Sequence, residues 1–139
     1  MPTREDFKKL SEERLSAIKT LLKNGHYDIV CQDSGYVLEF GLKASVCKTL
    51  KRNVYPENIR KYRTHNLNNL IDLAKLKDSL NNKKKNNINF FVNWSLLSKW
   101  SVEFRYEPIG KNKKENAEEV VNAIENEKDG VYPWIKENW

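Results

Sequence analysis

The sequence predicts an all-α fold, an up-and-down antiparallel bundle of four to five helices in a single domain over residues 1–139. Apolar residues recur at helical spacing through most of the chain. Only five Gly and four Pro are present, which is few for a protein of many short strands and tight turns. A hydrophobic content of 39%, with four Trp, six Tyr and five Phe, is too high for a disordered chain.

The first two helices are expected in the N-terminal third of the chain. Thr3 can cap the first helix, which Asn24-Gly25 ends. A longer, central helix is expected from about Tyr27 to Leu50. Gly35 and Gly41 each cost this helix about 1 kcal/mol relative to Ala, a cost that is tolerated where another helix backbone comes close.

The middle of the chain is more polar. The segment from Arg52 to Thr64 is expected to be a loop with a short helical turn that starts at Pro56. Thr64 is expected to cap a third helix, and the lysine-rich and asparagine-rich run of residues 81–87 is expected to be a solvated connector. The apolar positions of the third helix are Leu67, Leu70, Ile71 and Ala74, with Leu80 as a possible extension.

The C-terminal third begins with the most aromatic segment, from Ile88 to about Trp100, which favours a helix. Its aromatic stripe of Phe90, Trp94, Leu97 and Trp100 is expected to be core or a dimer interface. Residues 105–114 are expected to form a loop. A last helix is expected from about Ala117 to Ile135, broken or kinked near Gly130 and Pro133.

Cysteine usage and hydropathy favour a cytoplasmic protein. Cys31 and Cys47 lie on the same expected helix, about 24 Å apart by the rise per residue, which is beyond disulfide reach. They are therefore interpreted as buried free thiols of a reducing compartment. The N-terminus lacks the apolar core of a signal peptide, and no apolar stretch is long enough to span a membrane. No Cys or His spacing is typical of a zinc site, and neither a metal nor another cofactor is expected.

Positive charge is concentrated between residues 43 and 63, which hold seven basic residues and one acid, Glu57. A basic segment of this kind attracts polyanions, so RNA or a nucleotide is the expected ligand. The alternative is a lysine-rich solvated surface without a ligand. The candidate nucleic-acid-binding residues are Lys48, Lys51, Arg52, Lys61 and Arg63.

Glu39 and Lys43 lie four residues apart on the expected central helix. As an exposed pair they would stabilise the helix by only a few tenths of a kcal/mol. The alternative is that Glu39 binds a polar group in a groove of the bundle.

Several short motifs, in order, resemble the HEPN family. Gly25-His26-Tyr27-Asp28-Ile29 followed by Glu39-Phe40-Gly41-Leu42-Lys43-Ala44 resembles the start and middle of the family's central helix. Thr64-His65-Asn66-Leu67 resembles the start of its third helix, and Arg105-Tyr106-Glu107-Pro108 resembles a later loop. Residues 117–134 resemble the closing helix, so the resemblance extends from about Arg14 to Lys136.

This resemblance implies a helical bundle that dimerises and, in many members, acts as a metal-independent ribonuclease with an Arg, four to six residues, and a His. Arg60 and His65 match that spacing, with Lys61 at the position where ribonuclease members tend to carry Asn, Asp or His. The resemblance makes Glu39, Arg105 and Tyr106 candidate groove residues.

The expected chemistry follows from these two residue types. Histidine moves protons near neutral pH, as the attack of a 2′-hydroxyl requires, and a guanidinium stabilises the charge that develops on the phosphate. His65 and Arg60 are the candidate catalytic residues of an endoribonuclease in a toxin–antitoxin or phage-defence system. The structural alternatives are that His65 fixes the entry of the third helix and that Arg60 is an ordinary solvated side chain.

Two further functions are consistent with the sequence. One is a noncatalytic interaction module that binds a partner protein such as a nucleotidyltransferase. The other is a general helical nucleic-acid binder, for which loss of the His65 side chain would have no effect.

Overall fold

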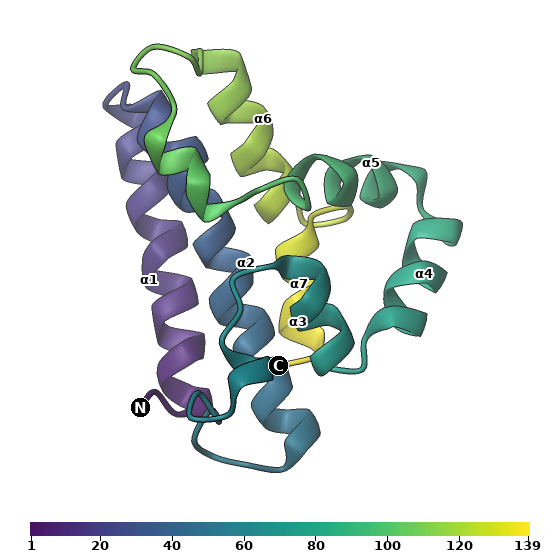
Figure 1. The fold of residues 1–139 in the computed structure, drawn as a ribbon. Coiled ribbons are helices and arrows are strands. Elements are labelled where there is room, and N and C mark those ends of the chain that lie inside the picture. Colours follow the sequence, from purple (N-terminus) through teal and green to yellow (C-terminus); the bar gives the residue numbers. More distant parts are fainter.

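The computed structural model describes all 139 residues and contains seven α-helices, two short 3-10 turns and no strand. Figure 1 shows the long helices α1 and α2 side by side, with α6 and α7 against them and α3, α4 and α5 packed beside this bundle. The all-α bundle is confirmed, with more helices than the four to five that the sequence predicted. The helices are α1 (Arg4–Lys23), α2 (Tyr27–Leu50), α3 (Leu67–Leu73), α4 (Lys77–Asn86), α5 (Ile88–Leu97), α6 (Lys114–Glu125) and α7 (Val131–Glu137), and the turns are η1 (Arg60–Tyr62) and η2 (Val102–Tyr106).

The first two helices begin and end as their sequence predicts. The Thr3 side chain accepts a hydrogen bond from the Asp6 amide, and the Asp6 carboxylate accepts one from the Thr3 amide, which together cap α1. Gly25, in the left-handed region at φ 81°, turns the chain into α2. The predicted bounds of the second helix, Tyr27 and Leu50, are confirmed.

Helix α2 is central because it contacts α1, α3, α6, α7 and η2. Its two glycines make room for side chains and not, as predicted, for the backbone of another helix. A Cβ atom on Gly35 would lie 1.8 Å from Cδ2 of Trp100. A Cβ atom on Gly41 would lie 2.8 Å from Cγ2 of Ile135. The Trp100 ring and the α7 side chain therefore occupy the space that these glycines leave.

The start and the end of the third helix differ from the prediction. Asn66 caps α3 by accepting from the Asn69 amide, whereas Thr64, two residues earlier, accepts from the Asn66 amide. The helix ends at Leu73, and Lys75 follows in the left-handed region at φ 57°. Leu80 consequently belongs to the next helix, α4.

The predicted connector at residues 81–87 is wrong, since α4 continues to Asn86. The sequence of α4 has no apolar stripe that would predict a helix, because Leu80 is its only buried residue. Asn87 ends α4 and at the same time caps α5 by accepting from the Phe90 amide. The two helices consequently follow one another without a loop.

The aromatic stripe on and after α5 lies in the core. Phe90, Trp94, Leu97 and Trp100 are all buried, and the rings of Phe90 and Trp94 both pack against Trp134 of α7. Beyond this stripe, η2 forms a short turn at 102–106, where part of a loop was expected. The predicted break in the last helix is confirmed at residues 126–130, while Pro133 lies in the first turn of α7, where it is tolerated.

Both cysteines are free and buried, as predicted. Burial raises the pKa of the Cys31 thiol to about 11 and also raises the pKa of Cys47, so neither is an activated thiolate. None of the helices combines the length and the apolar content needed to cross a bilayer.

Candidate functional site

The segment that follows α2 is held against the start of α1. The Arg4 amide donates to the Asn53 carbonyl at 2.7 Å, and the Tyr55 amide donates to the Pro2 carbonyl at 3.1 Å. The chain then forms η1 at Arg60, four residues later than the turn predicted at Pro56, which is itself buried. The N-terminus thereby anchors the basic segment on the bundle.

Two buried tyrosines fix the fold of this segment. The Tyr55 hydroxyl donates to the Tyr62 carbonyl at 2.8 Å, and the two rings meet edge to face. Burial, the largest influence, raises the pKa of Tyr55, so the phenol keeps its proton. The Arg63 guanidinium donates to the carbonyls of Glu57 and Asn58 at 2.8 and 3.2 Å. These bonds close the loop immediately before His65.

The centre of the site is the Glu39 carboxylate, whose side chain is only 2% exposed. One of its oxygens, Oε2, lies 3.2 Å from Lys43 Nζ, and the other, Oε1, lies 2.8 Å from His65 Nδ1. The Lys43 ammonium also lies over the rings of Phe7 and Tyr55, at 5.7 and 5.3 Å from their centroids. A buried charge is therefore compensated on both of its oxygens.

His65 lies at the boundary between this buried pair and solvent. Its side chain is 57% exposed, in contrast to Glu39 beneath it. With the carboxylate accepting from Nδ1–H, the second ring nitrogen, Nε2, has no hydrogen-bond partner in the chain. A carboxylate that holds one nitrogen of an exposed imidazole fixes its tautomer and leaves the other nitrogen available for proton transfer.

This geometry corrects the interpretation of Glu39 and Lys43 as an exposed helix pair. Both side chains are buried, and Glu39 binds a polar group, His65, which was the alternative. Lys43 is thus neutralised inside the bundle and does not contribute to the basic surface. That surface consists of the exposed residues Lys48, Lys51, Arg52, Arg60, Lys61 and Arg63.

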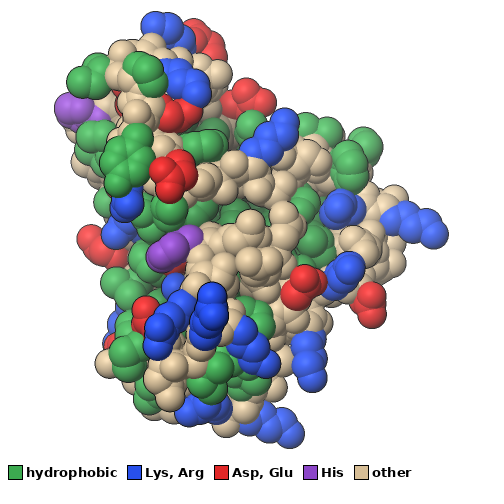
Figure 2. All heavy atoms as spheres, in the orientation of Figure 1, with side chains coloured by type: hydrophobic (Ala, Val, Ile, Leu, Met, Phe, Trp, Pro, Cys, Tyr) green, Lys and Arg blue, Asp and Glu red, His purple; other side chains and the backbone are tan.

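The basic residues gather on one face of the molecule. Figure 2 shows Lys and Arg side chains close together on the lower part of the view, over the end of α2 and the segment that follows it, with a histidine beside them. Lys61 lies over the ring of Tyr62, at 5.1 Å from its centroid. The sole acid of the window, Glu57, is exposed and forms no ion pair.

The other candidate residues lie apart from the buried pair. Arg60 is exposed on η1, and its side chain makes no hydrogen bond or ion pair, to His65 or to any other residue. Arg105 and Tyr106 are on η2, which packs against α2, and the Arg105 guanidinium lies 4.9 Å from the centroid of the Tyr106 ring. Of the candidates, then, Glu39 and His65 are the pair that a side-chain hydrogen bond joins.

Lys43 was missed as part of the site, although the sequence contains a signal for it. Glu39 and Lys43 are the only charged residues in the otherwise apolar and small run from Ser34 to Cys47. A helix that is apolar all round is a buried helix, so a charged pair within it must be paired inside the protein.

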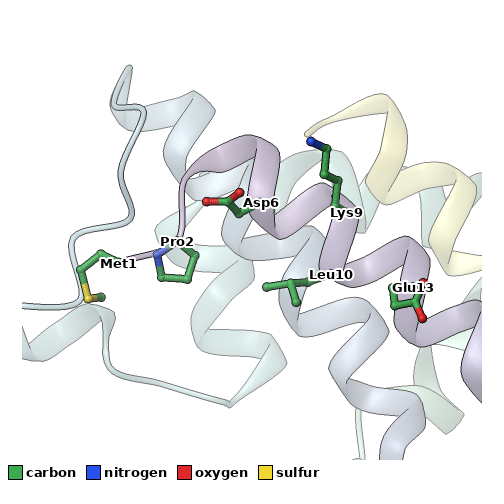
Figure 3. A pocket seen from close by; sticks show the side chains of 6 residues that line it. All are labelled: Met1, Pro2, Asp6, Lys9, Leu10 and Glu13. Atoms are coloured by element: carbon green, nitrogen blue, oxygen red, sulfur yellow. The ribbon is translucent and has the colours of Figure 1, made fainter.

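Two other features offer no comparable set of converging side chains. A surface pocket near the N-terminus is lined by Met1, Pro2, Asp6, Lys9, Leu10 and Glu13, and Figure 3 shows these side chains spread along α1 and not converging on one point. Its Asp6 is engaged in capping α1. No three His, Cys, Asp or Glu side chains are grouped so that they could hold a metal ion.

Comparison with known proteins identifies the family. No match was found among curated proteins or among solved structures. The family model described as the HEPN domain matches residues 5–128, which include all but the first residue of α1, the whole of α2, the basic segment, Glu39 and His65. The chain therefore belongs to the HEPN domain family.

Proposed function

We propose that this HEPN protein binds RNA through its basic surface and cleaves it as a metal-independent endoribonuclease, with His65 as the proton-transfer residue. The single observation that supports this most is the 2.8 Å hydrogen bond between the buried Glu39 carboxylate and the exposed His65 ring. The Glu39 charge is already paired with the buried Lys43 ammonium, and its other oxygen holds the ring of an exposed histidine, as the groups that orient a catalytic base do.

The reaction would use groups on this face only. His65 Nε2 accepts the proton of a ribose 2′-hydroxyl, and the resulting oxyanion attacks the adjacent phosphorus atom. The bond from phosphorus to the 5′-oxygen breaks, and that oxygen takes a proton from solvent. The products are a 2′,3′-cyclic phosphate and a 5′-hydroxyl.

Arg60 has the role of the phosphate ligand in this proposal. Its guanidinium is free of protein partners and lies on the turn that precedes His65. A free guanidinium fork can donate two charge-assisted hydrogen bonds to the phosphate oxygens as their charge grows. Lys48, Lys51, Arg52, Lys61 and Arg63 then hold the flanking phosphates.

The assembly and setting of the protein are part of the proposal. A homodimer that brings two such sites together, located in the cytoplasm, is what the family resemblance and the two free thiols favour. A ribonuclease of this kind would serve a toxin–antitoxin or phage-defence system.

The test is incubation of labelled single-stranded RNA with the purified protein in EDTA. Wild type, Arg60→Ala and His65→Ala are compared, with His26→Ala as the matched control because His26 is exposed and its side chain makes no capping bond. Wild type and His26→Ala should give 2′,3′-cyclic phosphate ends, and the other two variants should lose cleavage by at least a hundredfold. Equal cleavage by His65→Ala and His26→Ala would refute the proposed role of His65.

Glu39 is tested in a form that keeps the protein folded. The double variant Glu39→Gln, Lys43→Met removes both buried charges together, so that neither is left unpaired. It should bind RNA as wild type does and cleave it more slowly, because the His65 ring loses its carboxylate partner. Wild-type cleavage by this variant would show that Glu39 does not orient the base.

A noncatalytic interaction module is the second candidate function, and one observation favours it. Ile88, Phe91 and Val92 share one face of α5 and are 69%, 41% and 55% exposed. An apolar helix face of this kind fits a protein partner, for example a nucleotidyltransferase. Binding of a purified nucleotidyltransferase that is abolished by Ile88→Asp, together with no binding or cleavage of RNA, would establish this function in place of the first.

A further inference from the structure

We infer that a cavity between α2, α5, η2 and α6 binds a small zwitterion with an apolar body, namely a free α-amino acid with an apolar side chain. The cavity shares no residue with the candidate site around Glu39 and His65, so the inference does not depend on RNA binding. It is carried by the apolar walls of the cavity and by four polar groups that line it and have unused bonding capacity.

The walls of the cavity are mainly apolar and are held in place by the fold. Its volume is about 210 Å³, which suits a ligand smaller than a drug-sized molecule. The indole N–H of Trp100 donates to the Gln32 carbonyl at 2.8 Å, and its ring occupies the space that Gly35 leaves, so this wall is preformed. The large apolar side chains that line the cavity are Leu96, Leu97, Trp100, Phe104 and Val120.

Two opposite charges line the same cavity from different elements. Lys99 follows α5, and Glu119 lies on α6. Both are exposed, and neither forms an ion pair with the other or with a third residue. By contrast, Lys114 and Glu118 on α6 do pair with each other. The cavity therefore offers one free ammonium and one free carboxylate to a ligand that reaches it from solvent.

Two asparagines add a neutral partner for each sign of charge. Asn112 Nδ2 donates to the Asp28 carboxylate at 3.1 Å, so its carbonyl oxygen Oδ1 is left as a free acceptor. Asn116 is in the opposite state, because its Oδ1 accepts from the Lys113 amide at 2.9 Å and its Nδ2 is left as a free donor. Both asparagines line the cavity.

These groups select the ligand by its chemistry. The ammonium of an α-amino acid can donate to Glu119 and to the Asn112 carbonyl, while its carboxylate can accept from Lys99 and from the Asn116 amide. An apolar side chain then covers the walls of the cavity. A nucleotide phosphate is disfavoured, because Lys99 is the only cation in the lining and Glu119 repels a second negative charge. One end of a peptide carries only one of the two charges and leaves the other group of the cavity unpaired.

The ligand side is tested by isothermal titration calorimetry of the wild-type protein without RNA. The probes are leucine, phenylalanine and two analogues of leucine that each lack one charge. The analogue 4-methylpentanoate lacks the ammonium, and 3-methylbutylamine lacks the carboxylate. Leucine or phenylalanine should bind, and the two analogues should bind about tenfold to a hundredfold more weakly than leucine, the range for loss of a charge-assisted hydrogen bond.

The protein side is tested with Glu119→Gln and Lys99→Met, two exposed positions at which a substitution leaves the core intact. Glu119→Gln should no longer distinguish leucine from 4-methylpentanoate. Lys99→Met should no longer distinguish leucine from 3-methylbutylamine. Glu118→Gln is the matched control, because Glu118 is the preceding residue of α6 and does not line the cavity, and it should bind leucine as wild type does.

Three results would overturn the inference. Neither amino acid binds at millimolar concentration, or the single-charge analogues bind as well as leucine, or Glu119→Gln and Glu118→Gln bind leucine equally. Failure of the proposed function is distinguishable from all three, since loss of RNA cleavage with leucine binding retained would refute the ribonuclease alone.

Discussion

Glu39 is the residue on which the candidate site depends most, and its effect on stability can be predicted. Glu39→Gln leaves the buried Lys43 ammonium without its counter-charge, which should lower the free energy of unfolding by about 3–5 kcal/mol. Adding Lys43→Met should recover most of that loss, because neither charge is then buried alone. Urea denaturation of the single and double variants measures both values.

A matched pair on the surface serves as the control. Lys114 and Glu118 have the same i, i+4 spacing on α6, at 3.7 Å, but their side chains are 65% and 53% exposed. Glu118→Gln should change the free energy of unfolding by less than about 0.5 kcal/mol. If Glu39→Gln costs no more than this control, the pair is not buried as the structure has it.

The change in the free energy of unfolding on Gly35→Ala has opposite signs if helix propensity or if packing dominates. Propensity alone would make Gly35→Ala stabilising by about 1 kcal/mol. Because the added Cβ would lie 1.8 Å from Trp100, we expect Gly35→Ala to destabilise the protein by about 1–3 kcal/mol instead. In a Trp100→Leu background this penalty should shrink, which a double-mutant cycle by urea denaturation detects. A stabilised Gly35→Ala protein would contradict this packing.

At the scale of elements, Asp28 at the start of α2 connects that helix to the loop before α6. Its carboxylate accepts from the Gly110 amide at 2.7 Å and from the amide and side chain of Asn112 at 2.9 and 3.1 Å. These bonds, that from Gly110 first, lower the pKa of Asp28 below its ordinary value of 3.8. The carboxylate thus joins the loop between η2 and α6 to the central helix.

The pH dependence of this connection has a defined sign. Because the pKa of Asp28 is lower in the folded state, its stabilising effect is complete above the ordinary value and is lost as pH falls through the lowered one. Wild type should therefore be more stable than Asp28→Asn at pH 6, and the difference should shrink below about pH 4. Thermal unfolding of both proteins from pH 2.5 to 6 measures this, and a difference that grows on acidification would contradict it.

The elements that the sequence predicted well are those with strong local signals. A capping residue, a glycine stop and apolar periodicity defined α1 and α2 to the residue at most ends. Helix α4 was missed because its stability comes from packing against α5 and not from an apolar stripe of its own. The cap of α3 was placed at Thr64 because Thr64 and Asn66 are both good capping residues, and only tertiary position distinguishes them.

The candidate site was predictable only in part. The spacing between Arg60 and His65 predicted these two as catalytic residues, and the resemblance to the HEPN family predicted Glu39 as a groove residue. The contact between His65 and Glu39 depends on how the chain after α2 folds back. Hydrogen bonds from the Arg4 amide to the Asn53 carbonyl and from the Tyr55 amide to the Pro2 carbonyl set that path, and no local sequence pattern encodes them. The burial of Lys43 likewise depends on tertiary packing, although the apolar residues around it in the sequence already indicate a buried helix.

At the scale of the whole molecule, charge is arranged unevenly around the bundle. The exposed basic residues from Lys48 to Arg63 lie at the end of α2 and on the segment that leads to His65, whereas the lysines of α4 belong to a helix that Figure 1 shows away from that segment. The net charge of +6 alone would attract RNA to either region. Only the dependence of affinity on salt, measured variant by variant, distinguishes a defined binding face from general attraction.

The last prediction uses that dependence. For single-stranded RNA the logarithm of the affinity should fall linearly with the logarithm of salt concentration, with a slope of about −0.7 for each phosphate neutralised. Lys48→Ala combined with Arg52→Ala should make the slope shallower by about 1.4, because two phosphate contacts are lost. Lys77→Ala combined with Lys85→Ala removes the same charge from exposed positions on α4 and should leave the slope unchanged, provided that RNA contacts the face beside His65. Equal slopes for the two double variants would mean that RNA is held by overall charge and not by this face.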